Sequence, residues 1–365
     1  MRYPKAPKSI GILGGGQLAR MIALDAHSMG IEPWVLSANE SDPAAQVTSF
    51  WIKGDPNKTA DLKKLFKHVD VATVESEFFE PTVLKNAGKI YPQPELLGLL
   101  QDRLSQKMLL QKLNVPTAEF ISVSNHIDAQ TAANEFGFPF VLKKRRFGYD
   151  GYGTFVIKNK KDLSNIPGEI HGYIAEAFVP FKRELAVSFV RSINAEIISL
   201  PLVETCQKNS ICHWVMGPVT HQNGYALLRL LKAFVENTKY IGIIAFEVFD
   251  TGKELLVNEI APRVHNSAHY SMDALNFSQF EYHIRAITSQ PLPDPVPRHA
   301  GFAMVNLLGS GKKSPHWIAP VDGKLHWYGK SENRLGRKMG HINVLAKNPK
   351  LALKSAINAA RNISI

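Results

Sequence analysis

Two glutamates stand inside apolar runs of the chain, where a carboxylate is unusual. Glu247 lies in residues 243–249 and Glu259 in residues 254–260, and the letters DTGK separate the two runs. Two apolar runs around a glycine-containing turn are typical of a β-hairpin. A carboxylate in such a strand needs a partner that offsets its desolvation, and one divalent cation shared by both acids would provide it.

The register of this hairpin decides whether the two carboxylates meet. A turn centred near Lys253 places Glu247 and Glu259 opposite each other, with Cβ atoms about 5 Å apart. A turn centred on Thr251 and Gly252 leaves them about three residues out of step, near ~10 Å. Two exposed glutamates on an edge hairpin are the alternative to a metal site.

A group of polar residues follows Glu259. Pro262 cannot continue a strand ladder, and Arg263, His265 and Asn266 come directly after it. The guanidinium fork of an arginine suits a planar oxyanion, and an imidazole can accept a proton near neutral pH. We therefore expect a catalytic loop here, with a loop held by backbone hydrogen bonds as the alternative.

The first 40 residues predict a strand, a glycine turn, a helix and a second strand. The strands are expected at residues 9–13 and 33–36, the helix at 20–29, and the letters GGGQLA between them fit G-x-G-x-x-A. Such a turn lets backbone N–H groups approach an anion. The second strand ends in Ser-Ala-Asn, without the acid that binds the ribose of NAD. The turn therefore favours the phosphate of a smaller substrate, unless its glycines serve packing alone.

A helix at residues 58–67 and a strand at 69–74 continue the alternation, and the strand ends at Glu75 and Glu77. In an open α/β sheet this is the edge where ligands bind. Acids two residues apart point the same way from an extended chain, so we expect both to meet one amine or hydroxyl of a ligand. Two solvated loop acids are the alternative.

The next segment favours nucleotide binding. Residues 139–156 predict a hairpin that carries Lys143 and a glycine-rich tip able to close over phosphates, unless it is a plain flexible hairpin. A strand at residues 173–178 carries Glu176, and Glu184 follows. The backbone of such a strand can pair with adenine and a nearby carboxylate can bind ribose hydroxyls.

Length and composition limit the class of protein. A chain of 365 residues exceeds the size at which single cores stop growing, so two or three domains are expected. No apolar run approaches the ~18 residues of a membrane span, and Cys206 and Cys212 match no redox or zinc spacing. We expect a cytosolic protein without a disulfide.

The net charge of +11 raises the hypothesis of nucleic-acid binding, but the basic residues are scattered and no nucleic-acid motif accompanies them. Anionic small substrates serve equally well. Near the C-terminus, basic residues recur at helical spacing and predict a solvated helix face: Lys347, Lys350, Lys354 and Arg361. Arg337 and Lys338 form a basic pair that either reaches the cleft or lies on the surface.

Six motifs make the chain similar to a known family: GGGQLARM, QDRLSQK, KKRRFGYDGYG, NEIAPRVHNSAH, QFEYHIRAI and GRKMGHINV. With the letters EAFV and Glu184, they resemble the ATP-grasp superfamily and, more closely, its 5-(carboxyamino)imidazole ribonucleotide synthase family. The resemblance implies an α/β and α+β architecture, in which an ATP-grasp fold joins an N-terminal Rossmann-like parallel-sheet domain and a small C-terminal β-rich domain. We expect these parts at residues 101–292, 1–100 and 293–365.

The resemblance also implies roles for individual residues. The ATP contacts would be Arg103, Lys143, Gly148, Tyr149, Asp150, Gly151, Tyr152, Gly153, Thr154, Glu176, Ala177, Phe178, Val179, Glu184, Gln207, Asn258 and Glu259. The ribonucleotide contacts would be Gly16, Gln17, Leu18, Glu75, Tyr149, Asn266, Arg337 and Lys338. The metal ligands would be Glu247 and Glu259, and the catalytic residues Arg263, His265 and Lys338.

Four positions depart from the family pattern. Gln207 stands where the family often has a nucleotide-contacting histidine, and it cannot carry that charge. Phe147, Ala19 and Ala268 each replace a glycine, which should mainly stiffen the local backbone.

The implied reaction is the carboxylation of the exocyclic amine of 5-aminoimidazole ribonucleotide in purine biosynthesis. ATP and bicarbonate would form carboxyphosphate, and ADP and phosphate would be released. The implied cofactors are ATP and Mg²⁺, with Mn²⁺ as an alternative, and the implied assembly is a homodimer in the cytoplasm, without a nucleic-acid or membrane partner. Two other readings stay open: an ATP-grasp ligase with another substrate, such as a formyl-transferring purine enzyme or a biotin carboxylase, and a basic binding protein that kept the fold and lost the chemistry.

Overall fold

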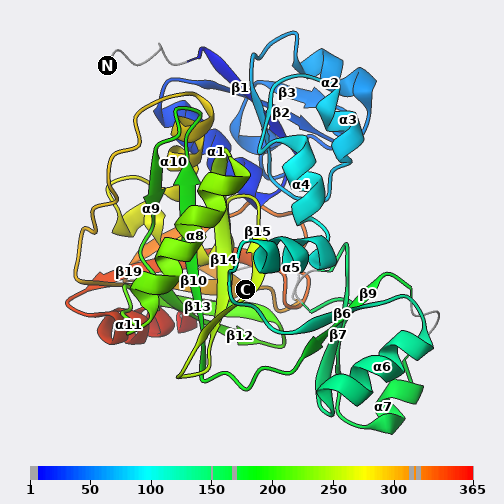
Figure 1. Ribbon diagram of the computed structural model, residues 1–365. Helices are drawn as coiled ribbons and strands as arrows, with labels where there is room; N and C mark the ends of the chain where they lie inside the picture. The colour runs from blue at the N-terminus through cyan, green and yellow to red at the C-terminus, as the bar shows by residue number, and fades with distance from the viewer. Residues whose placement is uncertain (1–6, 149–150, 167–170, 312–315, 318–321, 365) are drawn as a thin grey trace.

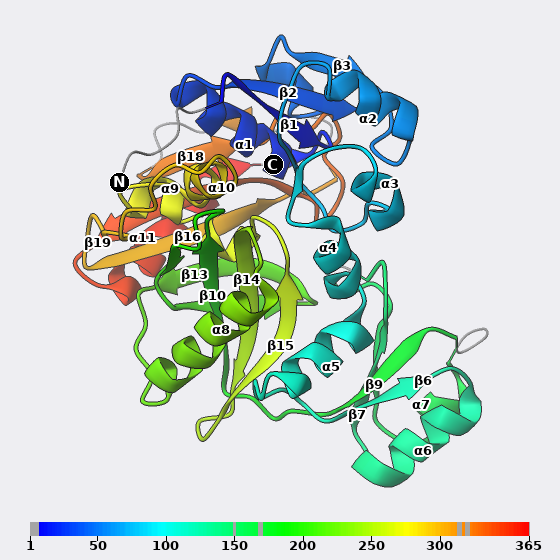
Figure 2. The same ribbon diagram turned by 45° about the horizontal axis from the view of Figure 1, so that its top comes forward.

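The computed structural model describes residues 7–148, 151–166, 171–311, 316–317 and 322–364 (Figures 1 and 2). In these residues the chain forms an N-terminal parallel sheet, a projecting lobe and a large antiparallel sheet that continues to the C-terminus. Among the helices of the described part, none is long and apolar enough to cross a membrane.

The N-terminal sheet is parallel and has the strand order β3-β2-β1-β4-β5. Its elements are β1 (Ser9–Leu13), α1 (Gln17–Ser28), β2 (Glu32–Ser37), β3 (Trp51–Lys53), α2 (Thr59–Leu65), β4 (Ala72–Val74), α3 (Pro81–Lys85), β5 (Ile90–Tyr91) and α4 (Pro94–Leu100). The alternation was predicted, although α2 and β4 are shorter than expected. Pro94 begins α4, at a position where its missing N–H would have no partner within the helix.

A small lobe projects from one side of the molecule beyond α5 (Arg103–Lys112) (Figures 1 and 2). Its four-stranded sheet has the order β6-β9-β7-β8, and two helices cover it. The elements are β6 (Phe120–Val123), α6 (His126–Phe136), β7 (Phe140–Lys144), β8 (Thr154–Ile157), α7 (Lys160–Ser164) and β9 (Tyr173–Ala177). The predicted hairpin is therefore the β7–β8 pair, in which Lys143 lies opposite Thr154.

The large sheet has the order β15-β14-β10-β12-β13-β16-β19-β18, and β11 pairs with β10. The first part is β10 (Arg183–Arg191), β11 (Ile197–Ser199), β12 (Val203–Lys208), β13 (Ile211–Gly217), α8 (Gly224–Thr238), β14 (Gly242–Asp250), β15 (Leu255–Ala261), α9 (Ser271–Ala274) and α10 (Gln279–Ile287). Helices α8 and α10 pack on its two faces, each over an apolar cluster. In Figure 1, α8 crosses in front of β10 and β14.

The C-terminal strands extend this same sheet, because β16 pairs with β13. The elements are β16 (Gly301–Leu308), β17 (His316–Trp317), β18 (Lys324–Trp327), β19 (Lys338–Ala346), α11 (Pro349–Arg361) and β20 (Ile363–Ser364). Helix α11 buries Ala352, Ala356 and Ala359 against β16 and β19. The predicted basic residues of this region are exposed, as expected of a solvated helix face. The domain limits at residues 100 and 292 stay predictions.

Asp25 joins the N-terminal sheet region to α10. Its carboxylate on α1 accepts a hydrogen bond from the Ser278 hydroxyl, and Ser278 is the N-cap of α10. Burial raises the pKa of Asp25 to about 6. The ionised carboxylate is therefore less stable in the folded protein than in the unfolded chain.

Asp25→Asn should stabilise the protein at about pH 8 and have a smaller effect at about pH 5. Because the folded pKa lies above the ordinary value of 3.8, the wild type loses stability as pH rises between these two values, and the full cost is present above pH 6. The difference between the two pKa values limits the gain to ~3 kcal/mol. Thermal unfolding of both proteins at both pH values measures it, and an equal change in Tm at each pH would contradict the prediction.

Candidate active site

The hairpin β14–β15 places the two predicted metal ligands opposite each other. Glu247 pairs with Glu259, which is the register that favours a shared ion. The turn itself pairs Asp250 with Leu255, and a β-bulge between Glu247 and Val248 then shifts the register by one residue. Without this bulge the two acids would not be partners.

The extra residue of the bulge is Asn258, since Val248 pairs with Val257 and Glu247 with Glu259. A bulge re-aims side chains next to it. Asn258 Oδ1 accepts a hydrogen bond from Lys143 Nζ at 3.0 Å, while its neighbour Glu259 contacts Arg103. Successive residues of one strand therefore both face the projecting lobe and α5, where regular pleating would send them to opposite faces.

The two glutamates of the hairpin have different surroundings. Both oxygens of Glu259 accept hydrogen bonds from Arg103 Nη2, at 3.0 and 3.1 Å. Burial and the charge of Glu259 raise the pKa of Glu247 to about 7, and Glu184 adds to the effect. The ring of His265 lies near Glu247, with Nε2 3.7 Å from Oε1. A carboxylate so crowded by other acids is one whose ionised form a cation would stabilise.

Arg103 ties α5 to the glycine-rich hairpin as well as to Glu259. Its guanidinium donates to the carbonyl oxygens of Lys144 at 3.0 Å and Gly148 at 3.3 Å. Helix α5 begins at this residue because Asp102 caps it by accepting hydrogen bonds from the N–H groups of Leu104 and Ser105. The arginine is thus fixed at the first turn of the helix.

Lys143 and Glu176 form the centre of the predicted nucleotide site. Lys143 Nζ donates to Glu176 Oε2 at 2.9 Å. A second ammonium, Lys107 of α5, lies 3.4 Å from the same oxygen and donates to Thr117 Oγ1 at 2.6 Å. Burial lowers the pKa of Lys107 to about 8. Burial opposes ionisation of Glu176, but the two lysines hold its pKa below the ordinary value.

Lys107 was missed in the sequence, although it lies in the QDRLSQK motif. Its position could have identified it, because Lys107 follows Arg103 by four residues and residues four apart share one face of a helix. Glu176 Oε1 has no hydrogen-bond partner in the described part of the chain although it is buried, so the Lys143–Glu176–Lys107 group has acceptor capacity to spare for a ligand.

Other predicted ATP contacts lie at the end of β9 and on β10 and β12. Glu184 of β10 is held by the backbone N–H of Gln207, which opposes the rise in the pKa of Glu184 that burial causes. Ala177 ends β9, and Phe178 after it is exposed. The register shifts at Gln207, so the residue that replaces a family histidine also sits at an irregularity of β12.

The glycine-rich tip is described in part. Tyr149 and Asp150 lie outside the described residues. Gly151 and Gly153 have φ values of +82° and +75°, which explains why glycine is needed there. Phe147 also has a positive φ, +59°, a conformation that costs a bulky residue about 1–2 kcal/mol. The expected stiffening by Phe147 is therefore accompanied by strain.

Glu75 and Glu77 hydrogen-bond to different groups of the protein, and their meeting at one ligand group stays a prediction. Strand β4 ends at Val74, and the chain beyond it is not extended. Glu77 pairs with Arg263, whose Nε and Nη2 both donate to its carboxylate, the latter at 3.0 Å. Arg263 is thereby joined to the N-terminal sheet.

Glu75 occupies the amides that were predicted to hold a phosphate. Its carboxylate accepts hydrogen bonds from Gly16 N at 2.7 Å and Ala19 N at 3.2 Å, at the start of α1. Gln17 and Leu18 lie in the same turn. A phosphate could use these amides only after Glu75 has left, because two anions cannot share them. The glycine turn and Glu75 therefore form one unit.

Asn266 was predicted to contact substrate, but both ends of its amide are already engaged. Asn266 Nδ2 donates to Asn306 Oδ1 at 3.0 Å, and Asn306 Nδ2 donates to Asn266 Oδ1 at 2.7 Å. Asn306 lies on β16, so this amide pair joins the loop after β15 to a C-terminal strand. The polar group is satisfied within the protein, and Asn266 holds the loop in place.

Asn306→Ala should lower the free energy of unfolding by about 1–3 kcal/mol, because it leaves both the Asn266 amide and the Cys212 carbonyl without their partner. Thermal unfolding measures the loss. Asn358→Ala, on the exposed side of α11, is the control and should leave Tm almost unchanged. A smaller loss at Asn306 than at Asn358 would show that the amide pair contributes nothing.

The predicted basic pair separates. The charge of Lys338, at the start of β19, acts on Glu247 and His265, so this residue lies toward the hairpin acids. Arg337 instead donates to the carbonyl oxygen of Glu332 at 3.1 Å, and it lies 3.7 Å from the Glu332 carboxylate. The structure thus brings Lys338 to the site and places Arg337 at a surface loop.

Burial and the nearby charges of Arg263 and Lys338 lower the pKa of His265 well below its ordinary value. Its Nδ1 lies 2.9 Å from Ser267 Oγ. The ring is therefore neutral near physiological pH, with Nδ1 facing Ser267 and Nε2 facing Glu247. Arg263, His265 and Lys338 together provide two positive charges and one proton acceptor beside Glu247.

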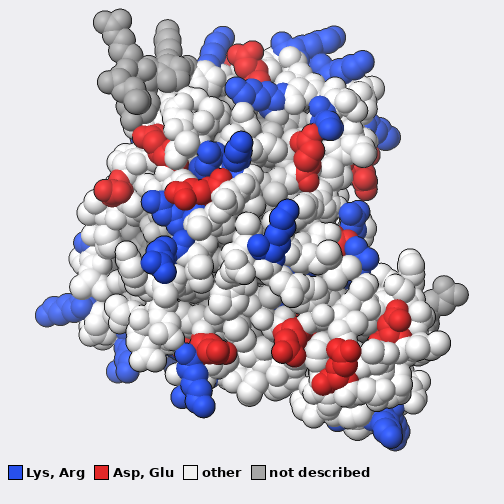
Figure 3. Space-filling view, in the orientation of Figure 1, with Lys and Arg blue, Asp and Glu red and all other residues white. Residues whose placement is uncertain are grey.

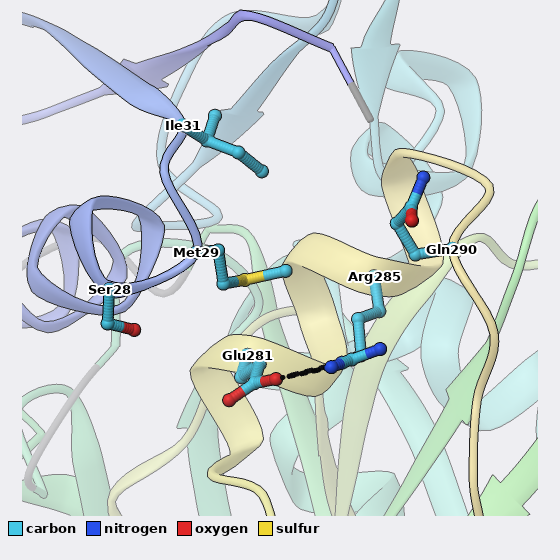
Figure 4. Close-up of a pocket in the computed structure, with 6 residues that line it drawn as sticks. All are labelled: Ser28, Met29, Ile31, Glu281, Arg285 and Gln290. Atoms are coloured by element: carbon cyan, nitrogen blue, oxygen red, sulfur yellow. Dashed lines mark hydrogen bonds and ion pairs between the residues drawn. The ribbon is translucent and has the colours of Figure 1, made fainter. Parts of the chain in front are cut away.

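Two other surface features lie apart from these residues. A pocket of about 320 Å³ between the end of α1 and α10 is lined by none of the predicted site residues, and a Glu281–Arg285 ion pair crosses its wall (Figure 4). On the face in Figure 3, Lys and Arg side chains lie among Asp and Glu side chains.

In the described residues, no group of three or more His, Cys, Asp or Glu side chains could hold a metal ion by itself.

The fold and this site define an ATP-grasp protein. Residues 108–280 match the ATP-grasp domain, residues 7–101 the ribonucleotide synthetase preATP-grasp domain, and residues 303–355 the phosphoribosylaminoimidazole carboxylase C-terminal domain. A protein from Synechococcus elongatus that carries the name N5-carboxyaminoimidazole ribonucleotide synthase is 37% identical over 92% of this chain and 89% of its own length.

Solved structures of proteins with closely related names are similar to this chain over almost its whole length. N5-carboxyaminoimidazole synthetase from Staphylococcus aureus, complexed with ADP, has a TM-score of 0.89 and 32% identity over 99% of both chains. The Aspergillus clavatus enzyme, in complex with ADP and 5-aminoimidazole ribonucleotide, has a TM-score of 0.85 and 28% identity over 97% of this chain and 98% of that one. The chain belongs to the N5-carboxyaminoimidazole ribonucleotide synthase family, which confirms the predicted family and fold class.

Proposed function

We propose that this protein carboxylates the exocyclic amine of 5-aminoimidazole ribonucleotide with ATP and bicarbonate, and that it releases ADP and phosphate. The observation that carries the proposal is that one hairpin contacts both the proposed nucleotide site and the proposed site of carboxyl transfer. Glu259 contacts Arg103, and Glu247, which pairs with Glu259 across the hairpin, lies beside His265. The names and complexes of the relatives support the choice of substrates.

ATP would bind between the lobe and the large sheet. Lys143 would neutralise phosphate oxygens, since its Nζ already bridges Glu176 and Asn258. Arg103 would fix the tip of the β7–β8 hairpin over the nucleotide through its hydrogen bond to Gly148. Gln207 would contribute a neutral hydrogen bond where relatives often have histidine.

Glu247 and Glu259 fit a hard divalent cation. They are carboxylates, the ligands that Mg²⁺ prefers, and a cation there would stabilise the ionised form of Glu247, whose pKa burial and the charge of Glu259 raise to about 7. Glu247 and Glu259 would hold Mg²⁺, or Mn²⁺ in its place, and the ion would supply charge stabilisation for the transferring phosphoryl group.

The carboxyl transfer would use the residues beyond Glu259. A bicarbonate oxygen attacks the γ-phosphorus, ADP leaves, and carboxyphosphate remains. Arg263 and Lys338 would hold its oxygens by charge-assisted hydrogen bonds. The amine of the ribonucleotide then attacks the carboxyl carbon, phosphate leaves, and neutral His265 accepts the proton from the amine. Exclusion of water protects carboxyphosphate until this attack.

ADP release tests the proposal, with bicarbonate and aminoimidazole ribonucleotide each omitted in turn. Full release should require both. Turnover with another acceptor in place of the ribonucleotide would indicate a different ATP-grasp ligase. Absence of any acceptor-stimulated turnover would indicate a binding protein that lost the chemistry. The family resemblance also supports a homodimer in the cytoplasm, and sedimentation equilibrium would contradict the dimer by giving the mass of one chain.

A further inference from the structure

Two buried glutamines hold the backbone of the catalytic segment at its two ends. Gln106 of α5 and Gln279 of α10 are 5% and 0% exposed. Each side-chain amide binds both the backbone N–H and the backbone C=O of one residue in or just after β15. The residues so held are Ile260 and His265, and the segment between them contains Arg263.

Gln106 holds the metal-ligand end. Ile260 N donates to Gln106 Oε1 at 3.0 Å, and Gln106 Nε2 donates to Ile260 O at 2.8 Å. Strand β15 is at the edge of the sheet, so these two backbone groups have no neighbouring strand. The glutamine side chain replaces that strand at the residue directly after Glu259, next to the bulge that aims it.

Gln279 holds the other end. His265 N donates to Gln279 Oε1 at 2.8 Å, and Gln279 Nε2 donates to His265 O at 2.8 Å. Gln279 Nε2 also lies 2.7 Å from Nδ1 of His269, and its own N–H donates to Ser271 Oγ at 2.8 Å. Every polar atom of the amide is engaged, so the backbone of His265 is fixed while its ring faces Glu247 and Ser267.

We propose that Gln106 and Gln279 are separate positioning residues, Gln106 for Glu259 and metal-bound ATP, and Gln279 for His265 and carboxyl transfer. The inference rests on the proposed function, because it assigns one half of that reaction to each glutamine. It also gives a role to the second glutamine of the QDRLSQK motif and to the glutamine of the QFEYHIRAI motif. A displacement of about 1 Å in a reacting group can cost ~100-fold in rate, so losing either pair of hydrogen bonds should be visible in the kinetics.

The test replaces each glutamine by methionine, which has a similar length and cannot form these hydrogen bonds. Gln279→Met should lower product formation by about 10–100-fold, change the KM for ATP less than about threefold, and release more ADP than product as carboxyphosphate is lost to water. Gln106→Met should raise the KM for ATP at limiting Mg²⁺, with ADP and product falling together in a one-to-one ratio. Gln101→Met, at a buried glutamine that contacts the Phe79 carbonyl oxygen, is the matched control.

A purely structural role predicts a different result. Both variants would then lose Tm and change all parameters in proportion, or both would keep wild-type kinetics, and either result overturns the proposal. If Gln279→Met does not fold, Gln279→Glu keeps the acceptor for His265 N–H, and full coupling of ADP to product in that variant overturns the proposal equally. Failure of the proposed function is a separate result, since wild-type protein would then show no ribonucleotide-dependent ADP release.

Adding His265→Ala to Gln279→Met provides an independent check. If Gln279 acts through His265, the double variant should be no slower than His265→Ala alone. A further loss in product formation of more than about tenfold would show that Gln279 acts elsewhere.

Discussion

Glu259→Gln should lower ribonucleotide-dependent ADP release by at least about a thousandfold, or ~4 kcal/mol. The change removes one of two acids that face each other across the hairpin and leaves Glu247 as the only charged ligand for a cation. It keeps the side-chain length and an oxygen that can accept a hydrogen bond from Arg103. The loss should therefore appear in turnover and in the dependence on Mg²⁺, while the fold persists.

The control for this variant is Glu254→Gln, which makes the same chemical change at an exposed position in the turn of the same hairpin. Its turnover should match the wild type. Thermal unfolding of Glu259→Gln should give a Tm close to that of the wild type. Turnover within about tenfold of the wild type would remove Glu259 from the metal site.

The hairpin shows how far the sequence could predict this site. The apolar runs identified both strands and both acids, because short apolar runs around a glycine-containing turn are readable in the letters. The register was left open between two turn positions, and the structure reaches the favourable pairing by a route that neither described: a turn that pairs Asp250 with Leu255, followed by a bulge at Asn258. A bulge leaves little trace in a single sequence, since it depends on which backbone groups find partners in the folded sheet.

The acids after β4 show the limit more plainly. Their place directly after a strand was predicted correctly, since β4 ends at Val74, but spacing fixes direction only for an extended chain. Glu75 turns to the start of α1 and Glu77 to Arg263, and both partners come from other parts of the sequence. The same reason explains Asn266, whose partner Asn306 lies on another strand. These contacts depend on polar groups that are brought together only in the folded protein. The local sequence pattern carries no information about such partners.

His265→Ala should lower product formation by about 10²–10⁴-fold, while the affinity for ATP changes by less than about tenfold, or ~1.4 kcal/mol. The ring is neutral, lies beside Glu247 and touches none of the nucleotide-site residues Arg103, Lys143 and Glu176 through a recorded hydrogen bond or ion pair in the described residues. Direct titration with ATP and a product assay separate the two effects. His299→Ala, at an exposed position, is the control.

Arg263 needs a different design, because it is the partner of a buried carboxylate. Removing the arginine alone would leave Glu77 unpaired, which costs about 3–5 kcal/mol and mixes stability with catalysis. Arg263→Ala combined with Glu77→Gln removes both charges, so the fold should survive while product formation is abolished and ATP affinity stays within about tenfold. Glu77→Gln alone separates the two residues: it leaves Arg263 in place and should retain measurable turnover. Loss of ATP binding in the double variant or in His265→Ala would assign that residue to the nucleotide, and carboxyl transfer would then require another cation or base.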